Sequence, residues 1–150
     1  MAWEKEVIRV PGDVIRPTRV GSSAHAIRFG PLLFVTGQSG RRLEDPEYPT
    51  DVVEQARQCL DNIGAILREA GSSYEHVLKR TIVIRDRKEY DAIRPVIEEY
   101  FVSPVASSII ESGLLRDEQK ALEIEVIASV PDSEGGDASA SGGAVADAAG

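Results

Sequence analysis

The segment ALEIEVIASV at residues 121–130 alternates between apolar side chains and other side chains with a period of two. Residues two apart in a β-strand lie on the same face of the sheet. Glu123 and Glu125 therefore share one face with Ile127. The other face is apolar throughout and carries Leu122, Ile124, Val126 and Ala128. This segment is predicted to be a strand with one face in the core. The carboxylates of Glu123 and Glu125 on the other face must then be in contact with water, a partner or a site.

A long amphipathic helix is predicted to begin after Thr50 or Asp51 and to end at Gly71. Asp51 can cap its first turn, with Glu54 three residues later as the capping-box partner, and glycine is the usual residue just past a helix end. One face of this helix is apolar; it carries Val52, Ala56, Cys59, Leu60, Ile63, Ile66, Leu67 and Ala70.

The other predicted elements are short. Five more strands are expected at 5–10, 24–29, 31–39, 76–86 and 106–112, with a second helix at 90–101 that Pro95 should kink or shorten. The order is β-β-β-α-β-α-β-β, which indicates an α+β fold. Two helices can cover one face of such a sheet only. The open face should carry Ile127 and some of Phe34, Ile82, Ile84 and Ile109, and apolar sheet faces of this kind are usually oligomer interfaces.

The chain divides at Pro131. Residues 1–130 form one domain of ordinary size, and residues 131–150 are rich in Gly, Ala, Ser and Asp. Such a segment buries too little apolar surface to fold, so the tail is predicted to be disordered. It would serve either to keep the protein soluble or to bind a partner.

Composition excludes several classes of function. The sequence has no apolar run of transmembrane length and no secretory signal at its start, and its one cysteine fits a reducing cytoplasm. A formal net charge of −8 argues against nucleic-acid binding. His25, His76 and Cys59 are not spaced as metal ligands, so neither a metal nor a cofactor is expected.

Five segments are informative together. In order they are GPLLFVTGQSG, QARQCLDNIGAILREAGSSYEHVLKRTIVIRD, EYF, SPVASSI and LEIEVIA. Over residues 24–130 their order and spacing resemble the RidA/YjgF family. The resemblance implies a chorismate mutase-like mixed sheet backed by two helices. It also implies a homotrimer whose sheets line a central barrel, with small-molecule clefts between subunits.

The resemblance also implies a reaction. Active members of the family hydrolyse enamines and imines to ketones and ammonia, and they need no cofactor. The pocket hydroxyl of the family falls on Thr36, the glutamate that orients water falls on Glu123, and Gly37 occupies a position of close backbone approach. The candidate site therefore consists of Thr36 and Glu123 as catalytic residues and of Gly37 and Ser107 as substrate-binding residues.

The chain departs from the family at the residue that binds the substrate carboxylate. The family has an arginine in a Pro-Ala-Arg-Ser stretch, and here Ala106 stands at that position, between Pro104 and Ser107. Losing such a guanidinium costs roughly 2–5 kcal/mol of binding, so ordinary 2-imino acids should be poor substrates. The cations that could substitute are Arg28, Arg80 and the pair Arg41–Arg42. The family's pocket tyrosine is also missing, near Ser22–Ser23.

Two functions therefore remain open. The chain is either an enzyme that acts on an atypical C=N or enamine substrate, or a non-catalytic trimer whose clefts bind a metabolite or partner. A ribonuclease, claimed for some family members, would need a basic face rich in aromatic residues, which the sequence lacks.

Overall fold

The structure is a computed structural model that describes residues 2–18, 21–113 and 115–132, so most of the predicted disordered tail lies outside the described residues. Every predicted helix and strand is present. The strands are β1 (Lys5–Ile8), β2 (Ala26–Phe29), β3 (Leu32–Gln38), β4 (Val77–Ile84), β5 (Ala106–Glu111) and β6 (Leu122–Ser129). The helices are α1 (Val52–Glu69) and α2 (Tyr90–Tyr100), with short 3₁₀ turns at Tyr74–His76 and Arg87–Glu89.

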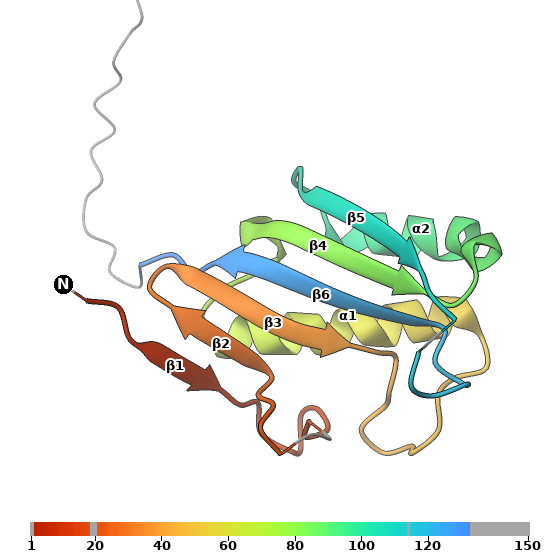
Figure 1. The fold of residues 1–150 in the computed structure, drawn as a ribbon, viewed down its shortest axis with the longest axis horizontal. Coiled ribbons are helices and arrows are strands. Elements are labelled where there is room, and N and C mark those ends of the chain that lie inside the picture. The colour runs from red at the N-terminus through yellow and green to blue at the C-terminus, as the bar shows by residue number, and fades with distance from the viewer. Residues whose placement is uncertain (1, 19–20, 114, 133–150) are drawn as a thin grey trace, which may run out of the picture.

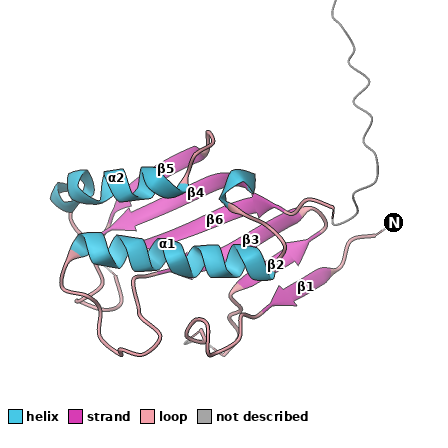
Figure 2. Ribbon diagram, turned by 180° about the vertical axis from the view of Figure 1, so that it is seen from behind, coloured by secondary structure: helices cyan, strands magenta, loops and turns pink. Residues whose placement is uncertain are grey.

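The six strands form one mixed sheet in the order β1-β2-β3-β6-β4-β5. Only the β4–β5 pair is parallel, and the other neighbours are antiparallel. The chain crosses from β3 to β4 through α1 and from β4 to β5 through α2, in the same direction both times. Because such crossovers are right-handed, both helices pack on the same face of the sheet (Figures 1 and 2). This confirms the α+β architecture.

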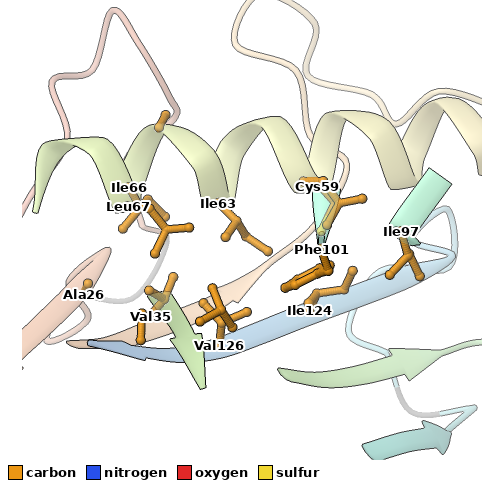
Figure 3. Packing of buried hydrophobic residues seen from close by; sticks show 14 of the residues in the cluster. Ala26, Val35, Cys59, Ile63, Ile66, Leu67, Ile97, Phe101, Ile124 and Val126 are labelled. Atoms are coloured by element: carbon orange, nitrogen blue, oxygen red, sulfur yellow. The ribbon is translucent and has the colours of Figure 1, made fainter. Parts of the chain in front are cut away.

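The core lies between this face and α1 (Figure 3). Asp51 caps the helix by accepting hydrogen bonds from the backbone N–H groups of Val53 and Glu54. Gly71 follows its end with a φ of +76°, a conformation that glycine adopts without strain. The predicted stripe is buried except at Val52, which is half-buried. Pro95 does not shorten α2, which continues to Tyr100.

The opposite face carries neither α1 nor α2 and is not covered by any helix of the described residues (Figure 1). Phe34 pairs with Ile127 at its centre and is 44% exposed. Ile110 at the β5 edge is 50% exposed. Of the other predicted residues, Ile82 and Ile84 are buried beneath the helices. Ile109 is exposed, but it is in register with Ile82 and so lies on the helix side, at an edge the helices leave uncovered.

Candidate functional site

An irregularity in the pairing of β3 with β6 brings the candidate site residues together. Val35 pairs with Val126 and Gln38 with Ile124, so β3 uses one residue more than β6 over this interval. The extra residue makes a β-bulge at Thr36–Gly37, and bulges re-aim side chains beside functional sites. Glu123, which precedes Ile124, lies next to the bulge. A Cβ added to Gly37 would fall on the Glu123 carboxylate, so only glycine lets the backbone approach this closely.

The bulge opens onto a cavity of about 440 Å³, a size typical of small-molecule sites. Its walls come from the loops that precede β2, follow β3 and precede β6, which lie along one edge of the molecule (Figure 1). The described lining residues are Ile15, Arg16, Pro17, Thr18, Ser23, His25, Thr36, Gly37, Gln38, Ser39, Arg41, Tyr48, Asn62, Leu115, Arg116, Asp117, Lys120 and Glu123. Thr36, Gly37 and Glu123 thus share one cavity.

The Glu123 carboxylate is held by Lys120. The Lys120 ammonium lies 2.7 Å from Glu123 Oε2, and the lysine side chain is 12% exposed. The turn before β6 supports this pair, since the Lys120 N–H donates to the backbone oxygen of Asp117. With Oε2 engaged, Oε1 is the oxygen nearest Gly37. One oxygen thus carries the ion pair and the other faces the bulge.

The Thr36 hydroxyl is fixed by the loop before β2. It donates to the backbone oxygen of Ala24 at 2.5 Å, and its lone pairs can still accept a hydrogen bond. Next to it, His25 Nδ1 accepts from the N–H of Val10 at 2.8 Å. The proton must then be on Nε2, which donates to the backbone oxygen of Arg16 at 3.0 Å. His25 is therefore a neutral residue that ties this loop together.

The other predicted site residues lie elsewhere in the chain. Arg28 donates to the backbone oxygen of Gly30. Arg80 is 7% exposed on the helix side, where it pairs with Glu98 at 2.9 Å and donates to Ser107 Oγ. None of Arg28, Arg80 and Ser107 is among the described residues that line the cavity.

Position 106 is also remote from Glu123 within one chain. Ala106 pairs with Lys79 and Glu123 pairs with Val83. These partners are four residues apart on β4, or about 13 Å at the rise of a strand. A side chain at position 106 could therefore act beside Glu123 only from another copy of the chain.

Several lining residues could not be found from the sequence pattern. Lys120, Arg116 and Tyr48 are in loops, where no periodicity indicates which way a side chain points. Tyr48 is buried and shares a hydrogen bond with Ser39. The sequence carries no signal that would place these three side chains in the cavity.

Cys59 is a core residue, as the sequence predicts. It is fully buried, and its thiol donates to the backbone oxygen of Gln38. Burial raises the pKa of the Cys59 thiol, so the thiolate form is disfavoured. No group of three or more His, Cys, Asp or Glu residues in the described ranges could hold a metal ion, and none of the helices there is long and apolar enough to cross a membrane.

A mixed sheet backed by two helices, with Thr36, Gly37 and Glu123 at a bulge, is the arrangement expected of a RidA-like protein. The sequence profile of the family described as Endoribonuclease L-PSP matches residues 15–130. The chain belongs to this family, which also includes the RidA and YjgF proteins.

Its relatives include a 2-iminobutanoate/2-iminopropanoate deaminase of Capra hircus. It is 30% identical over 126 residues, which is 81% of this chain and 90% of the relative. A Rid-family protein of Yersinia pestis, YyfA, has a similar structure, with a TM-score of 0.76 and 30% identity over 85% of this chain and all of the other. Escherichia coli TdcF, solved with bound serine, has a TM-score of 0.74 and 27% identity over 83% of this chain and 99% of the other.

Proposed function

We propose that this protein hydrolyses an imine or enamine to a ketone and ammonia in the cavity beside the β3 bulge. The observation that carries this proposal is the geometry of Glu123, whose Oε1 faces the Gly37 backbone while Oε2 is held by Lys120. A carboxylate with one fixed and one available oxygen is suited to orient a water molecule. Relatives named as imine deaminases support the same chemistry.

The reaction needs few groups. A water molecule placed by Glu123 attacks the carbon of the C=N bond and gives up a proton to the carboxylate. The carboxylate passes this proton to the nitrogen, which gives a carbinolamine. The hydroxyl of the carbinolamine then gives its proton to the amino group by way of Glu123, the C–N bond breaks as ammonia leaves, and the carbon–oxygen bond becomes the carbonyl of the ketone. Thr36 would accept a hydrogen bond from the substrate N–H. Such positioning can contribute up to roughly 7–11 kcal/mol in ideal cases.

The active form is proposed to be a homotrimer. The open sheet face carries exposed apolar side chains, including Phe34 and Ile110, and burying them against other copies would remove this surface from water. The neighbouring copy would also close the cavity from the side of the open face.

The proposal is tested by generating imines in situ with an amino-acid oxidase and trapping the remainder with semicarbazide. We expect the protein to accelerate the hydrolysis of at least one imine, and to act weakly on 2-iminobutanoate because position 106 is alanine. Replacing Ala106 with arginine should increase the rate on 2-iminobutanoate. Rapid turnover of this imine by the wild type would show that the alanine is not limiting, and no acceleration of any imine would contradict the enzymatic proposal.

A non-catalytic metabolite-binding trimer is the second candidate. It is favoured by Ala106, which leaves the chain without the guanidinium that binds the substrate carboxylate in active relatives of this type. In this case a metabolite would raise the melting temperature without being converted. The stabilisation would be about 2.7 kcal/mol at a hundredfold excess over the dissociation constant.

Replacing Gly37 with alanine should reduce turnover strongly and stability little. The added Cβ would displace the Glu123 carboxylate, which is the end of a flexible side chain and can move. Measuring kcat together with the melting temperature separates the two effects. Gly21 is a suitable control, because a Cβ there meets nothing within 4 Å. Full activity of Gly37→Ala would mean that the observed position of the carboxylate is not needed.

A further inference from the structure

Gln55 is a buried polar residue that the proposed reaction does not yet use. It lies in the first turn of α1 and is 2% exposed. Gly40 lets the loop after β3 pack directly on this part of the helix, since a Cβ added to Gly40 would lie 2.5 Å from the backbone oxygen of Gln55. A buried side-chain amide needs partners for its N–H donors and its carbonyl oxygen. The amide of Gln55 therefore has to be satisfied inside the protein.

The Gln55 amide uses both of its N–H donors and its carbonyl oxygen. Nε2 donates to the backbone oxygen of Pro49 at 2.7 Å and to that of Gln119 at 2.9 Å. Oε1 accepts from the backbone N–H of Ala121 at 3.0 Å. The opposite orientation would place the amide oxygen against two carbonyl oxygens, so these partners determine which way the amide points. Gln55 thus connects α1 to the segment that leads into β6.

The two hydrogen bonds on this segment flank Lys120. Residues 119–121 precede β6, and the side chain of Gln55 supplies hydrogen bonds of the kind that strand pairing supplies inside a sheet. The side chain of Lys120 lines the cavity, where its ammonium lies 2.7 Å from Glu123 Oε2. Because the backbone is held on both sides of Lys120, the positions that its ammonium can reach are restricted.

We propose that Gln55 is a positioning residue for the reaction, which holds the backbone on both sides of Lys120 and so sets the Lys120 ammonium against Glu123. The Oε1 atom of Glu123 is then left to orient the attacking water. This inference rests on the proposed function. Gln55 is not among the described residues that line the cavity, so it acts through Lys120 rather than on the substrate.

Gln55→Met tests this role, because methionine has a similar volume and forms none of the three hydrogen bonds. The variant should fold, since the backbone oxygen of Ala121 still accepts from the N–H of Arg85, just past β4, at 2.8 Å. We expect kcat for the best imine substrate to fall by up to about 10²-fold, the loss that a misplacement of about 1 Å can cause. KM should change little, because Gln55 does not touch the substrate.

Ser72→Ala is the control for a loss of stability alone. Ser72 is also buried, and its hydroxyl donates to the backbone oxygen of Ser129 at the other end of β6. This variant should have a lower melting temperature and an unchanged kcat. Equal losses of kcat in Gln55→Met and Ser72→Ala would overturn the proposal, because they would show that any weakening of the packing around β6 slows the reaction.

A double-mutant cycle with Lys120→Met shows whether Gln55 acts through Lys120. In Lys120→Met protein there is no ammonium to place, so adding Gln55→Met should lower kcat by less than about twofold. The melting temperature should fall by the same amount in both backgrounds, because the hydrogen bonds of Gln55 do not involve the Lys120 side chain. Losses of kcat that multiply across the two substitutions would overturn the proposal.

The positioning can also be measured without turnover, so that it can fail separately from the hydrolysis. Crystal structures at one pH should show the Lys120 ammonium within hydrogen-bond distance of Glu123 Oε2 in the wild type and in Ser72→Ala, and beyond it in Gln55→Met. This displacement in a protein that hydrolyses no imine would support the role of Gln55 in placing Lys120 and contradict the proposed function. An ammonium that does not move in an active enzyme would overturn the positioning role and leave the hydrolysis intact.

Discussion

Replacing Glu123 with glutamine is expected to lower kcat by about 10²–10⁴-fold, the usual contribution of a general acid or base. The substitution keeps the size and shape of the side chain but removes the charge that would orient water and accept its proton. Substrate binding should change less, because Thr36 rather than Glu123 is proposed to hold the substrate nitrogen. The measurement is the steady-state rate of ammonia release from the best imine substrate.

Glu125→Gln is the matched control for this experiment. Glu125 is two residues away on the same strand and the same sheet face, but it is exposed and does not line the cavity beside the bulge. The Glu125→Gln variant should retain most of the activity, and its oligomer should have the same mass as that of the wild type. Equal losses in the two variants would indicate an effect of charge on assembly, and would remove the reason to assign Glu123 a role in the reaction.

Replacing Phe34 with aspartate is expected to break the proposed homotrimer. Phe34 stands at the centre of the open face, paired with Ile127, so a carboxylate there would be buried without a partner at each copy of the interface. Buried unpaired charges are among the most destabilising changes known. Light scattering should show the mass falling from three times 16.2 kDa to 16.2 kDa.

Val102→Asp is the control for Phe34→Asp. Val102 is 74% exposed between α2 and β5, so the same change in charge at an apolar residue there should leave the mass unchanged. A wild-type protein with the mass of a single chain would contradict the trimer at once, and with it the idea that a neighbouring copy closes the cavity.

The fold could be predicted because its elements carry strong local signals. The period of two in β6 placed Leu122 and Ile124 in the core, and the stripe of α1 with Asp51 and Gly71 at its ends fixed that helix. The number of helices then implied an open sheet face. Periodicity could not decide which residues occupy that face on neighbouring strands, because this depends on register. For that reason Ile82 and Ile84 were only possible members of it, and the structure places both in the core.

The site could be predicted from the sequence in part. The resemblance pointed to Thr36, Gly37 and Glu123, which come from two neighbouring strands and line one cavity. It could not point to Lys120 or Arg116, because the direction of a loop side chain is set by tertiary contacts rather than by spacing. Arg80 is an error of the opposite kind. The sequence suggested it as a cation for the site, but its guanidinium is held by Glu98 and Ser107 on the helix side of the sheet.

The bulge in β3 has a consequence for how such proteins can diversify. By absorbing one residue at Thr36–Gly37, the strand keeps its pairing with β6 on both sides of the interruption. Beyond Arg41, whose backbone oxygen is still held by Asn62, the connection between β3 and α1 lies outside the sheet, so insertions and new charges there would leave the strand pairing in place. A lineage could in this way acquire a new substrate preference by changing this connection alone, while inheriting an unaltered scaffold.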